Sequence, residues 1–351
     1  AYKPVFVKSN GTNSRIDMGF STNCQNFYPV LSDNSSHTAT NLYTSGDYTG
    51  WNHFSISVDT NEIKVFINGT QVKNYTYSAV LDTLTAENSI GKRGSEFFSG
   101  LIDNIRIYDY ARTPAQIVYD YNKGAPVAHW KLDECQGTTV YDASGNNHGT
   151  LSIGTSGTQS SAGTCQTSGT AWGNGASGTR NSSLSFDGTD DFIDGISQLP
   201  ITTNPNLFTV TGYINPNNQN SFFITPNSCG MDHWISYNAD NQRLYVSVTE
   251  STDTNQRARY STTGSVPLDT WTHWAVSINN KNLKIFINGK LNAEYNETID
   301  ICGWSGDWHI GQRGNGTYWL SGKLDDIRVY NYELTAEQVK TLYNNGAVSF
   351  Q

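Results

Sequence analysis

The chain has 351 residues, of which 15% are charged, and its formal net charge is -9. This balance argues against nucleic-acid binding, because phosphate contacts need clustered Lys and Arg, which are few and scattered here. No stretch reaches the roughly 18 apolar residues of a membrane helix, so we expect no direct membrane insertion. The length suits two domains.

Residues 1–124 and 125–351 contain two copies of one repeat. The segment WNHFSISVDTNEIKVFINGTQV at Trp51 returns as WTHWAVSINNKNLKIFINGKLN at Trp271. The offset is 220 residues, and it becomes 222 after a two-residue insertion before Gly322. Because the register is so constant, we predict two homologous domains that meet at Gly124.

Alternating strands and turn dipeptides dominate both copies. Asn68-Gly69 and Asn288-Gly289 are turn signals that close the preceding strands into hairpins. In the second copy, Trp274, Val276 and Ile278 alternate with outward-facing positions, which is the period of a half-buried antiparallel strand. The sequence therefore predicts an all-β fold of antiparallel sandwiches.

Two aspartates fall on the apolar faces of predicted strands. Asp103 shares its face with Ile105, and Asp325 shares its face with Ile327. A buried carboxylate must accept hydrogen bonds or bind a cation such as calcium. Both explanations remain open at this point.

Each copy ends in a predicted short helix. Thr113 and Gln116 have the spacing of a capping box, and Thr335 and Gln338 repeat it in the second copy. One helix after many strands fits an all-β domain with a helical end.

Five cysteines indicate the cellular compartment. Cys135 and Cys165 bracket a loop rich in Gly, Ser and Thr, whereas Cys229 and Cys302 are both missing from the first copy, as disulfide partners would be. We predict the bridges Cys135–Cys165 and Cys229–Cys302, and therefore an extracellular location. Cys24 is left to pair outside this segment. The alternative is a cytosolic protein with five free thiols.

Residues 149–181 have the composition of a flexible loop. A structureless stretch of this length is unusual in a compact domain. We expect Cys165 to tether it.

The second copy carries a series of short motifs in a fixed order. They are AHWKLDE (Ala128), YDASGNNHGTL (Tyr141), LSFDGTDDFID (Leu184), KIFING (Lys284), HIGQRG (His309) and GKLDDIRVYNYELTAEQVKTLY (Gly322). The series resembles the laminin-G-like, concanavalin A-type jelly-roll family over essentially all of 125–351. The resemblance implies two antiparallel β-sandwich jelly rolls of the lectin/glucanase type, each with one short C-terminal helix.

The first copy lacks counterparts of the opening motifs, because Phe6 aligns with Pro226. A sandwich without its opening strands would expose unpaired backbone edges and apolar core. Two explanations are available. The chain is a window cut from a longer polypeptide, or another chain donates the missing strands by β-augmentation.

Carboxylates at predicted turns are candidate metal ligands. The turn FDGTDDFID contributes Asp187 and Asp191, and calcium takes about six to eight such oxygens. Members of the resembled family often hold calcium, which implies a structural Ca2+ at Asp187, Asp191, Asp325 and Asp103. The alternative is that Asp-Gly pairs only form turns.

Aromatic residues that differ between the copies are candidate ligand-binding residues. Trp304 and Trp308 align with Leu84 and Asn88, so the shared fold needs no aromatic ring at either place. His273 lies on the strand face opposite the apolar set. A sugar ring can stack on Trp, and we predict Trp308, Trp304 and His273 as ligand contacts, with packing as the alternative.

Catalysis has little support, because the E-x-D-x-x-E pattern of jelly-roll glycosidases is absent. The leading prediction is a secreted or cell-surface, non-catalytic protein that binds a glycan or a surface protein. The second is a stalk or filament subunit whose first copy is completed by a neighbouring chain, so that self-assembly runs through the incomplete domain. The third is a binding module of a larger glycoside-active enzyme.

Overall fold

The computed structural model describes most of the chain. The described residues are 3–9, 15–21, 25–32, 38–39, 44–46, 48–60, 62–76, 88–197, 199, 201, 207–228, 231–249, 256–297, 301, 304, 306–313, 316 and 318–344. They divide into two compact units, unit 1 (Ala1–Gly124) and unit 2 (Ala125–Gln351). The two units meet at the junction where the sequence repeat was divided.

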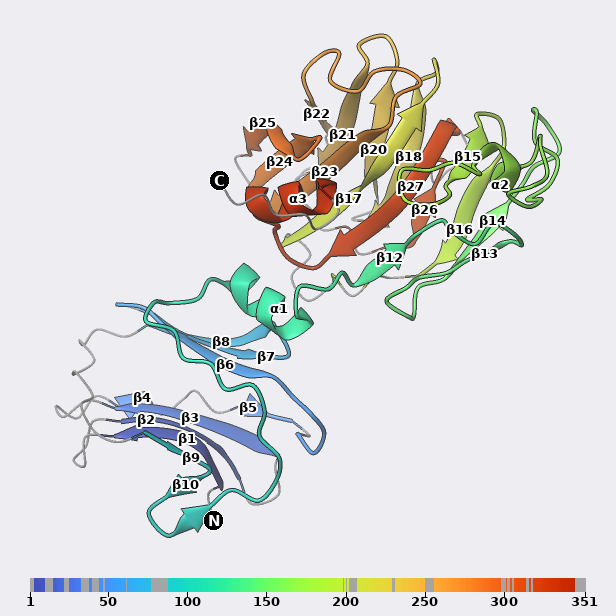
Figure 1. The fold of residues 1–351 in the computed structure, drawn as a ribbon. Helices are drawn as coiled ribbons and strands as arrows, with labels where there is room; N and C mark the ends of the chain where they lie inside the picture. The colour runs from blue at the N-terminus through green and yellow to red at the C-terminus, as the bar shows by residue number, and fades with distance from the viewer. Residues whose placement is uncertain are drawn as a thin grey trace. The chain divides into compact units, whose positions relative to one another are not determined.

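Unit 1 contains two main sheets (Figure 1). The strands of the first are β1 (Lys3–Ser9), β2 (Arg15–Phe20), β3 (Asn26–Ser32), β4 (Thr38–Ala39), β5 (Thr44–Ser45) and β9 (Asn88–Ile90). The order is β4-β3-β2-β1-β9, and β5 pairs with β3. The second sheet has β6 (Phe54–Val58), β7 (Glu62–Ile67) and β8 (Thr70–Thr76), in that order, and β10 (Lys92–Arg93) pairs with β11 (Glu96–Phe97).

Unit 2 contains two large antiparallel sheets. The first, called the β17 sheet, has β12 (Ala128–Trp130), β15 (Leu184–Asp187), β17 (Leu207–Pro216), β23 (Thr272–Asn279), β24 (Asn282–Ile287), β25 (Lys290–Asn296) and β27 (Ser321–Tyr330). Its order is β12-β27-β17-β23-β24-β25, and β15 also pairs with β27. Strand β27 therefore lies inside the sheet, with partners on both edges.

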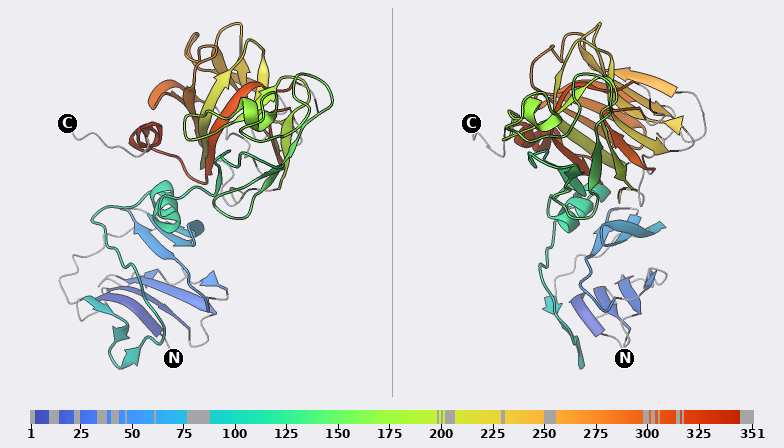
Figure 2. Two further views of the ribbon diagram at one scale, coloured as in Figure 1. Left: turned by 45° about the vertical axis from the view of Figure 1, so that its right-hand side comes forward. Right: turned by 90° about the vertical axis from the view of Figure 1, so that its right-hand side faces the viewer.

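The second sheet of unit 2 is called the β18 sheet. Its strands are β13 (Thr139–Val140), β14 (Gly149–Ser152), β16 (Phe192–Ile196), β18 (Ser221–Ser228), β19 (Met231–Asp232), β20 (Trp234–Asn238), β21 (Arg243–Thr249), β22 (Gln256–Tyr260) and β26 (Trp308–Ile310). The order is β13-β14-β16-β26-β18-β20-β21-β22, with β19 on β18. Figure 2 shows unit 2 from two further sides.

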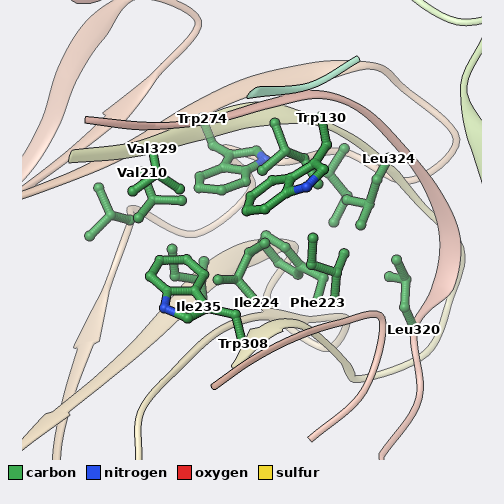
Figure 3. Packing of buried hydrophobic residues seen from close by; sticks show 14 of the residues in the cluster. Trp130, Val210, Phe223, Ile224, Ile235, Trp274, Trp308, Leu320, Leu324 and Val329 are labelled. Atoms are coloured by element: carbon green, nitrogen blue, oxygen red, sulfur yellow. The ribbon is translucent and has the colours of Figure 1, made fainter. Parts of the chain in front are cut away.

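The hydrophobic core of unit 2 lies between these two sheets (Figure 3). Fully buried side chains of the β17 sheet face fully buried side chains of the β18 sheet, among them Trp130, Trp274, Val210 and Val329 on one side and Phe223, Ile224, Ile235 and Trp308 on the other. This two-layer antiparallel packing confirms the predicted fold class.

Local sequence signals form the predicted turns and helices. At the two hairpin turns, Asn68 (φ 50°) precedes Gly69 (φ 77°) and Asn288 (φ 49°) precedes Gly289 (φ 74°), as a type I′ turn requires. Helices α1 (Pro114–Asn122) and α3 (Ala336–Tyr343) each begin at a complete capping box, at Thr113 and Thr335. One short helix thus ends each unit, as predicted.

The disulfide Cys135–Cys165 is confirmed. The predicted bridge between Cys229 and Cys302 lies outside the described residues, as does Cys24. Residues 149–181 are more structured than their composition suggested. They include β14 and the short helix α2 (Ala171–Asn174), and the ring of Trp172 is fully buried.

The strands of the two units correspond in register. Strands β7, β8 and β9 begin and end 220 residues before β24, β25 and β26, respectively. Among the described residues of unit 1, by contrast, none forms a counterpart of β12, β15 or β17. Within the continuously described stretch 88–197, residues 100–109 form no strand, although β27 is their counterpart in unit 2.

Candidate functional site

The two tryptophans predicted to bind ligand are buried. Trp304 and Trp308 both have 0% exposure, and their ring centroids lie 5.9 Å apart within the core. A fully buried ring offers no face to a sugar, so the prediction of ligand contacts is wrong for both, and packing is the correct explanation. Trp308 is covered because it pairs with Ile196 on β16, a strand with no counterpart in the described part of unit 1.

His273 is also buried, with 2% exposure. Its Nε2 lies 3.0 Å from Thr211 Oγ1, and its ring is 5.0 Å from that of Tyr213. Burial lowers the pKa of His273 to about 3, so the imidazole is neutral at physiological pH. The predicted ligand role is therefore wrong, and His273 is a packed, hydrogen-bonded residue.

Three aspartates of the β15–β16 hairpin form an acidic cluster. Asp187, Asp190 and Asp191 each offer a carboxylate oxygen, and these atoms lie within 4.8 Å of one another. Asp187 ends β15 and the other two occupy the turn before β16. Two of the four predicted calcium ligands, Asp187 and Asp191, are thus brought together, and Asp190 joins them.

The loop 154–159 closes over the acidic cluster. Asp187 Oδ2 accepts the backbone N–H groups of Thr158 (2.7 Å) and Gln159 (3.0 Å), and Asp190 Oδ2 accepts that of Ser156 (2.8 Å). An added Cβ at Gly154 would collide with the Asp190 carboxyl. A glycine there lets the loop backbone approach closely.

Asp191 is the buried member of the cluster, with 0% exposure. Burial, with the nearby charges of Asp187 and Asp190, raises the pKa of Asp191 to about 6. In the described part of the chain, the buried atoms Asp190 Oδ1 and Asp191 Oδ1 have no hydrogen-bond partner. Unpaired carboxylate oxygens at this spacing suit a hard cation such as Ca2+, which prefers oxygen ligands.

The other two predicted calcium ligands lie elsewhere. Asp325 is fully buried, but its Oδ2 accepts hydrogen bonds from Thr179 N, Thr179 Oγ1 and Arg180 N at 2.7 to 2.9 Å. Burial raises the pKa of Asp325 to about 6. Asp325 therefore ties down the loop before β15, and it is not in the acidic cluster.

Asp103 is exposed, so the predicted buried face does not exist in unit 1. Its two carboxylate oxygens accept hydrogen bonds only from the neighbouring Asn104 among the printed contacts of this segment, at 2.8 and 2.9 Å. The physical reason is that residues 100–109 are not in a sheet. The prediction of Asp103 as a metal ligand is wrong for this structure.

Aromatic side chains line the outer face of the β18 sheet. Phe222, Tyr245 and Tyr260 lie on β18, β21 and β22, and the cross-strand pairing links them in one row through Ser236 on β20. Their sequence neighbours Phe223, Leu244 and Val246 face the core, so the row faces away from it. We call this set, with Trp234 and Tyr318, the aromatic row.

The rings of the aromatic row contact one another continuously. Tyr245 and Tyr260 lie 4.9 Å apart, Trp234 is 6.0 Å from Tyr245, and Phe222 is 5.2 Å from Trp234. Tyr318, which is 56% exposed, lies 5.3 Å from Phe222. The row thus crosses four strands and ends at an exposed ring.

Two arginines lie over the aromatic row. The Arg243 guanidinium is 3.9 Å from the centroid of Tyr260, and that of Arg313 is 4.9 Å from Trp234. A guanidinium held flat on a ring keeps its N–H donors in plane and directed outward, available to hydroxyl or carboxylate oxygens. Rings and donors on one face can recognise a ligand with both apolar and hydroxyl-bearing surfaces.

The aromatic row was missed from the sequence. Trp234, Tyr245 and Tyr260 align at the 220-residue offset with Ser14, Gln25 and Thr40, so all three are aromatic only in the second copy. That difference was a usable signal. It was not used because the prediction followed the tryptophans near Cys302, and because cross-strand pairing is not visible in the sequence.

Unit 2 is defined by its structure as a two-sheet, jelly-roll type antiparallel sandwich with a solvent-facing aromatic row. The chain belongs to the concanavalin A-like lectin/glucanases superfamily, whose family model matches residues 1–118 and 187–340. The resemblance seen in the sequence is thereby confirmed. None of the curated proteins matches the chain.

Several solved structures share the fold at low identity. Domain 4 of AbnA, an extracellular GH43 arabinanase from Geobacillus stearothermophilus solved with arabinotriose, is 19% identical, with 62% of this chain and 98% of that one covered and a TM-score of 0.42. The receptor-binding domain of botulinum neurotoxin mosaic serotype C/D is 14% identical, with 63% and 50% covered and a TM-score of 0.45. The match thus spans half of that toxin domain.

Among the described residues, no helix has the length and apolar character needed to cross a membrane.

Proposed function

We propose that unit 2 is an extracellular, non-catalytic module that binds a glycan on the aromatic row. The observation that carries this proposal is the continuous set of ring contacts from Tyr318 to Tyr260 on the outward face of the β18 sheet. The lectin/glucanase superfamily to which the chain belongs supports a carbohydrate ligand. The Cys135–Cys165 disulfide supports an oxidising location.

The chemistry of the row suits a saccharide. The apolar face of a sugar ring packs on an aromatic side chain, while the hydroxyl groups at its rim need donors and acceptors. Tyr245 and Tyr260 supply packing surface and phenolic hydroxyls, and Arg243 supplies guanidinium donors beside them. Because the row extends over four strands, it suits an oligosaccharide better than a single sugar.

Calcium has a structural part in this proposal. The acidic cluster fits the ion, since it has three carboxylates within reach of one another and two unpaired buried oxygens, Asp190 Oδ1 and Asp191 Oδ1. Bound Ca2+ would neutralise the carboxylates that now repel one another. Asp187, Asp190 and Asp191 would hold it, and through their bonds to the loop 154–159 they would fix that loop to the β15–β16 hairpin.

A glycan array probed with the full chain tests the function. We expect binding to a defined group of oligosaccharides in the presence of calcium. Absence of binding to every glycan, both with calcium and with a chelator, would contradict the proposal. Release of shortened products from a bound glycan would contradict its non-catalytic part.

A further inference from the structure

Residues 100–109 of unit 1 expose apolar side chains that the repeat buries in unit 2. Ile107 is 70% exposed, whereas Val329, its counterpart at offset 222, has 0% exposure. The same contrast holds between Ile105 (41%) and Ile327 (0%). The difference lies in the neighbours, because in unit 2 these positions belong to β27, which is paired on both edges.

Strand β6 of unit 1 lacks a neighbour on the same side. It pairs with β7 only, whereas its counterpart β23 pairs with both β24 and β17. Phe54 and Ile56 are partly exposed, while their counterparts Trp274 and Val276 are fully buried. In unit 2, β17 fills the position between β23 and β27, antiparallel to each.

A single threonine of β17 shows how the position is filled. Thr209 Oγ1 lies 3.0 Å from Ser277 Oγ, donates to the carbonyl of Tyr332 and accepts the N–H of Leu334, each at 3.0 Å. In unit 1, Ser57 Oγ reaches across to the carbonyl of Arg112 directly, at 2.8 Å. Since Ser57 and Arg112 correspond to Ser277 and Leu334, unit 1 keeps both sides of the arrangement without the threonine between them.

We propose that unit 1 binds an extended peptide strand from outside these 351 residues, inserted between β6 and residues 100–109. The strand would run antiparallel to both and have the chemistry of β17. It would bring alternating apolar residues for Ile56 and Ile107, and a hydroxyl residue to take the Ser57 bond. Main-chain hydrogen bonds along two open edges provide affinity, and the apolar positions provide selectivity. This inference concerns unit 1 and is independent of glycan binding by unit 2.

The test uses the synthetic peptide LFTVTGYINP, the sequence of β17, with the full chain. We expect saturable binding by fluorescence anisotropy, and slower hydrogen exchange in β6 and in residues 100–109. A peptide with the Val210 position changed to Pro loses a ladder N–H and should bind at least tenfold more weakly. This peptide control does not depend on the folding of any variant chain.

Two matched substitutions in the chain locate the binding site. Ile107→Lys should weaken peptide binding at least tenfold, because the charge would be buried against the strand. Leu101→Lys should leave binding unchanged, because Leu101 is 78% exposed and its counterpart in unit 2 is already a lysine, Lys323. Both positions are exposed in the free chain, so neither change should alter its melting temperature.

Three results would overturn the proposal. One is equal binding of the two peptides, and another is protection of amides outside β6 and residues 100–109. The third is self-association of the chain that Ile107→Lys abolishes and the peptide does not displace. That result would assign this surface to a second copy of the chain.

Discussion

The backbone N–H of Asp187 donates to Asp191 Oδ2 at 3.1 Å, so the turn after β15 folds one aspartate back onto another. This bond holds two like charges together beside Asp190. Such an arrangement is costly unless a proton or a cation neutralises it. The acidic cluster is therefore where the stability of unit 2 should depend on solution conditions.

Calcium should stabilise unit 2 against unfolding. At a concentration 100 times its Kd, an ion that binds only the folded state adds about 2.7 kcal/mol to the free energy of unfolding. Asp191→Asn should remove most of this gain, whereas Asp194→Asn, outside the cluster, should retain it. Thermal melts with calcium and with chelator measure both. Equal melting temperatures of the wild type in the two conditions would refute a calcium site.

The pH dependence of the metal-free protein should have a definite sign. The pKa of Asp191 is about 6 in the folded state, above the ordinary 3.8, so the folded state holds this proton more tightly than the unfolded state. Stability relative to Asp191→Asn should therefore rise as pH falls from 7 through 6 and level off below about 4. Denaturant titrations in chelator at pH 7.5 and 5 give the difference. A fall in relative stability towards pH 5 would show that the sign is wrong.

Trp308→Ala should destabilise unit 2 without touching the aromatic row. Removing a fully buried indole leaves a cavity and costs about 3 to 5 kcal/mol. Trp51→Ala is the matched control, because that indole is 68% exposed and should change stability by less than about 0.5 kcal/mol. Urea unfolding followed by circular dichroism compares the two variants. Similar small losses in both would mean that Trp308 is not a core residue.

The Cys135–Cys165 bridge should contribute to the same unfolding transition. It closes a loop with a sequence separation of 30, for which the chain-entropy relation gives about 3 to 4 kcal/mol. Replacing both cysteines with serine should lower the free energy of unfolding of unit 2 by that amount. Addition of reductant to the wild type should approach the same value. No change in either experiment would exclude a structural role for the bridge.

Features encoded within a few residues could be predicted from the sequence. The Asn-Gly turns at Asn68 and Asn288 and the capping boxes at Thr113 and Thr335 depend on local chemistry, and all four formed as predicted. The repeat register also held, because homologous copies place corresponding strands alike. These local and repeated signals were enough to define the fold class.

The site residues depend on which strands become neighbours, and that was not visible in the sequence. Trp308 was read as exposed because its counterpart Asn88 is polar, but β16 covers it in unit 2. Tyr245 and Tyr260 are 15 residues apart in sequence and meet only through the pairing of β21 and β22. Alternation placed Asp103 in a buried strand, yet no strand forms without partners on its edges.

The central claim is that the aromatic row binds the glycan. Isothermal titration calorimetry with the strongest ligand from the array tests it most directly, using the wild type, the double variant Tyr245→Ala/Tyr260→Ala and the control Tyr141→Ala, which alters an exposed tyrosine near the opposite edge of the β18 sheet. We predict that the double variant loses at least tenfold in affinity while its melting temperature stays near that of the wild type and the control binds normally. Unchanged affinity in the double variant would contradict the account.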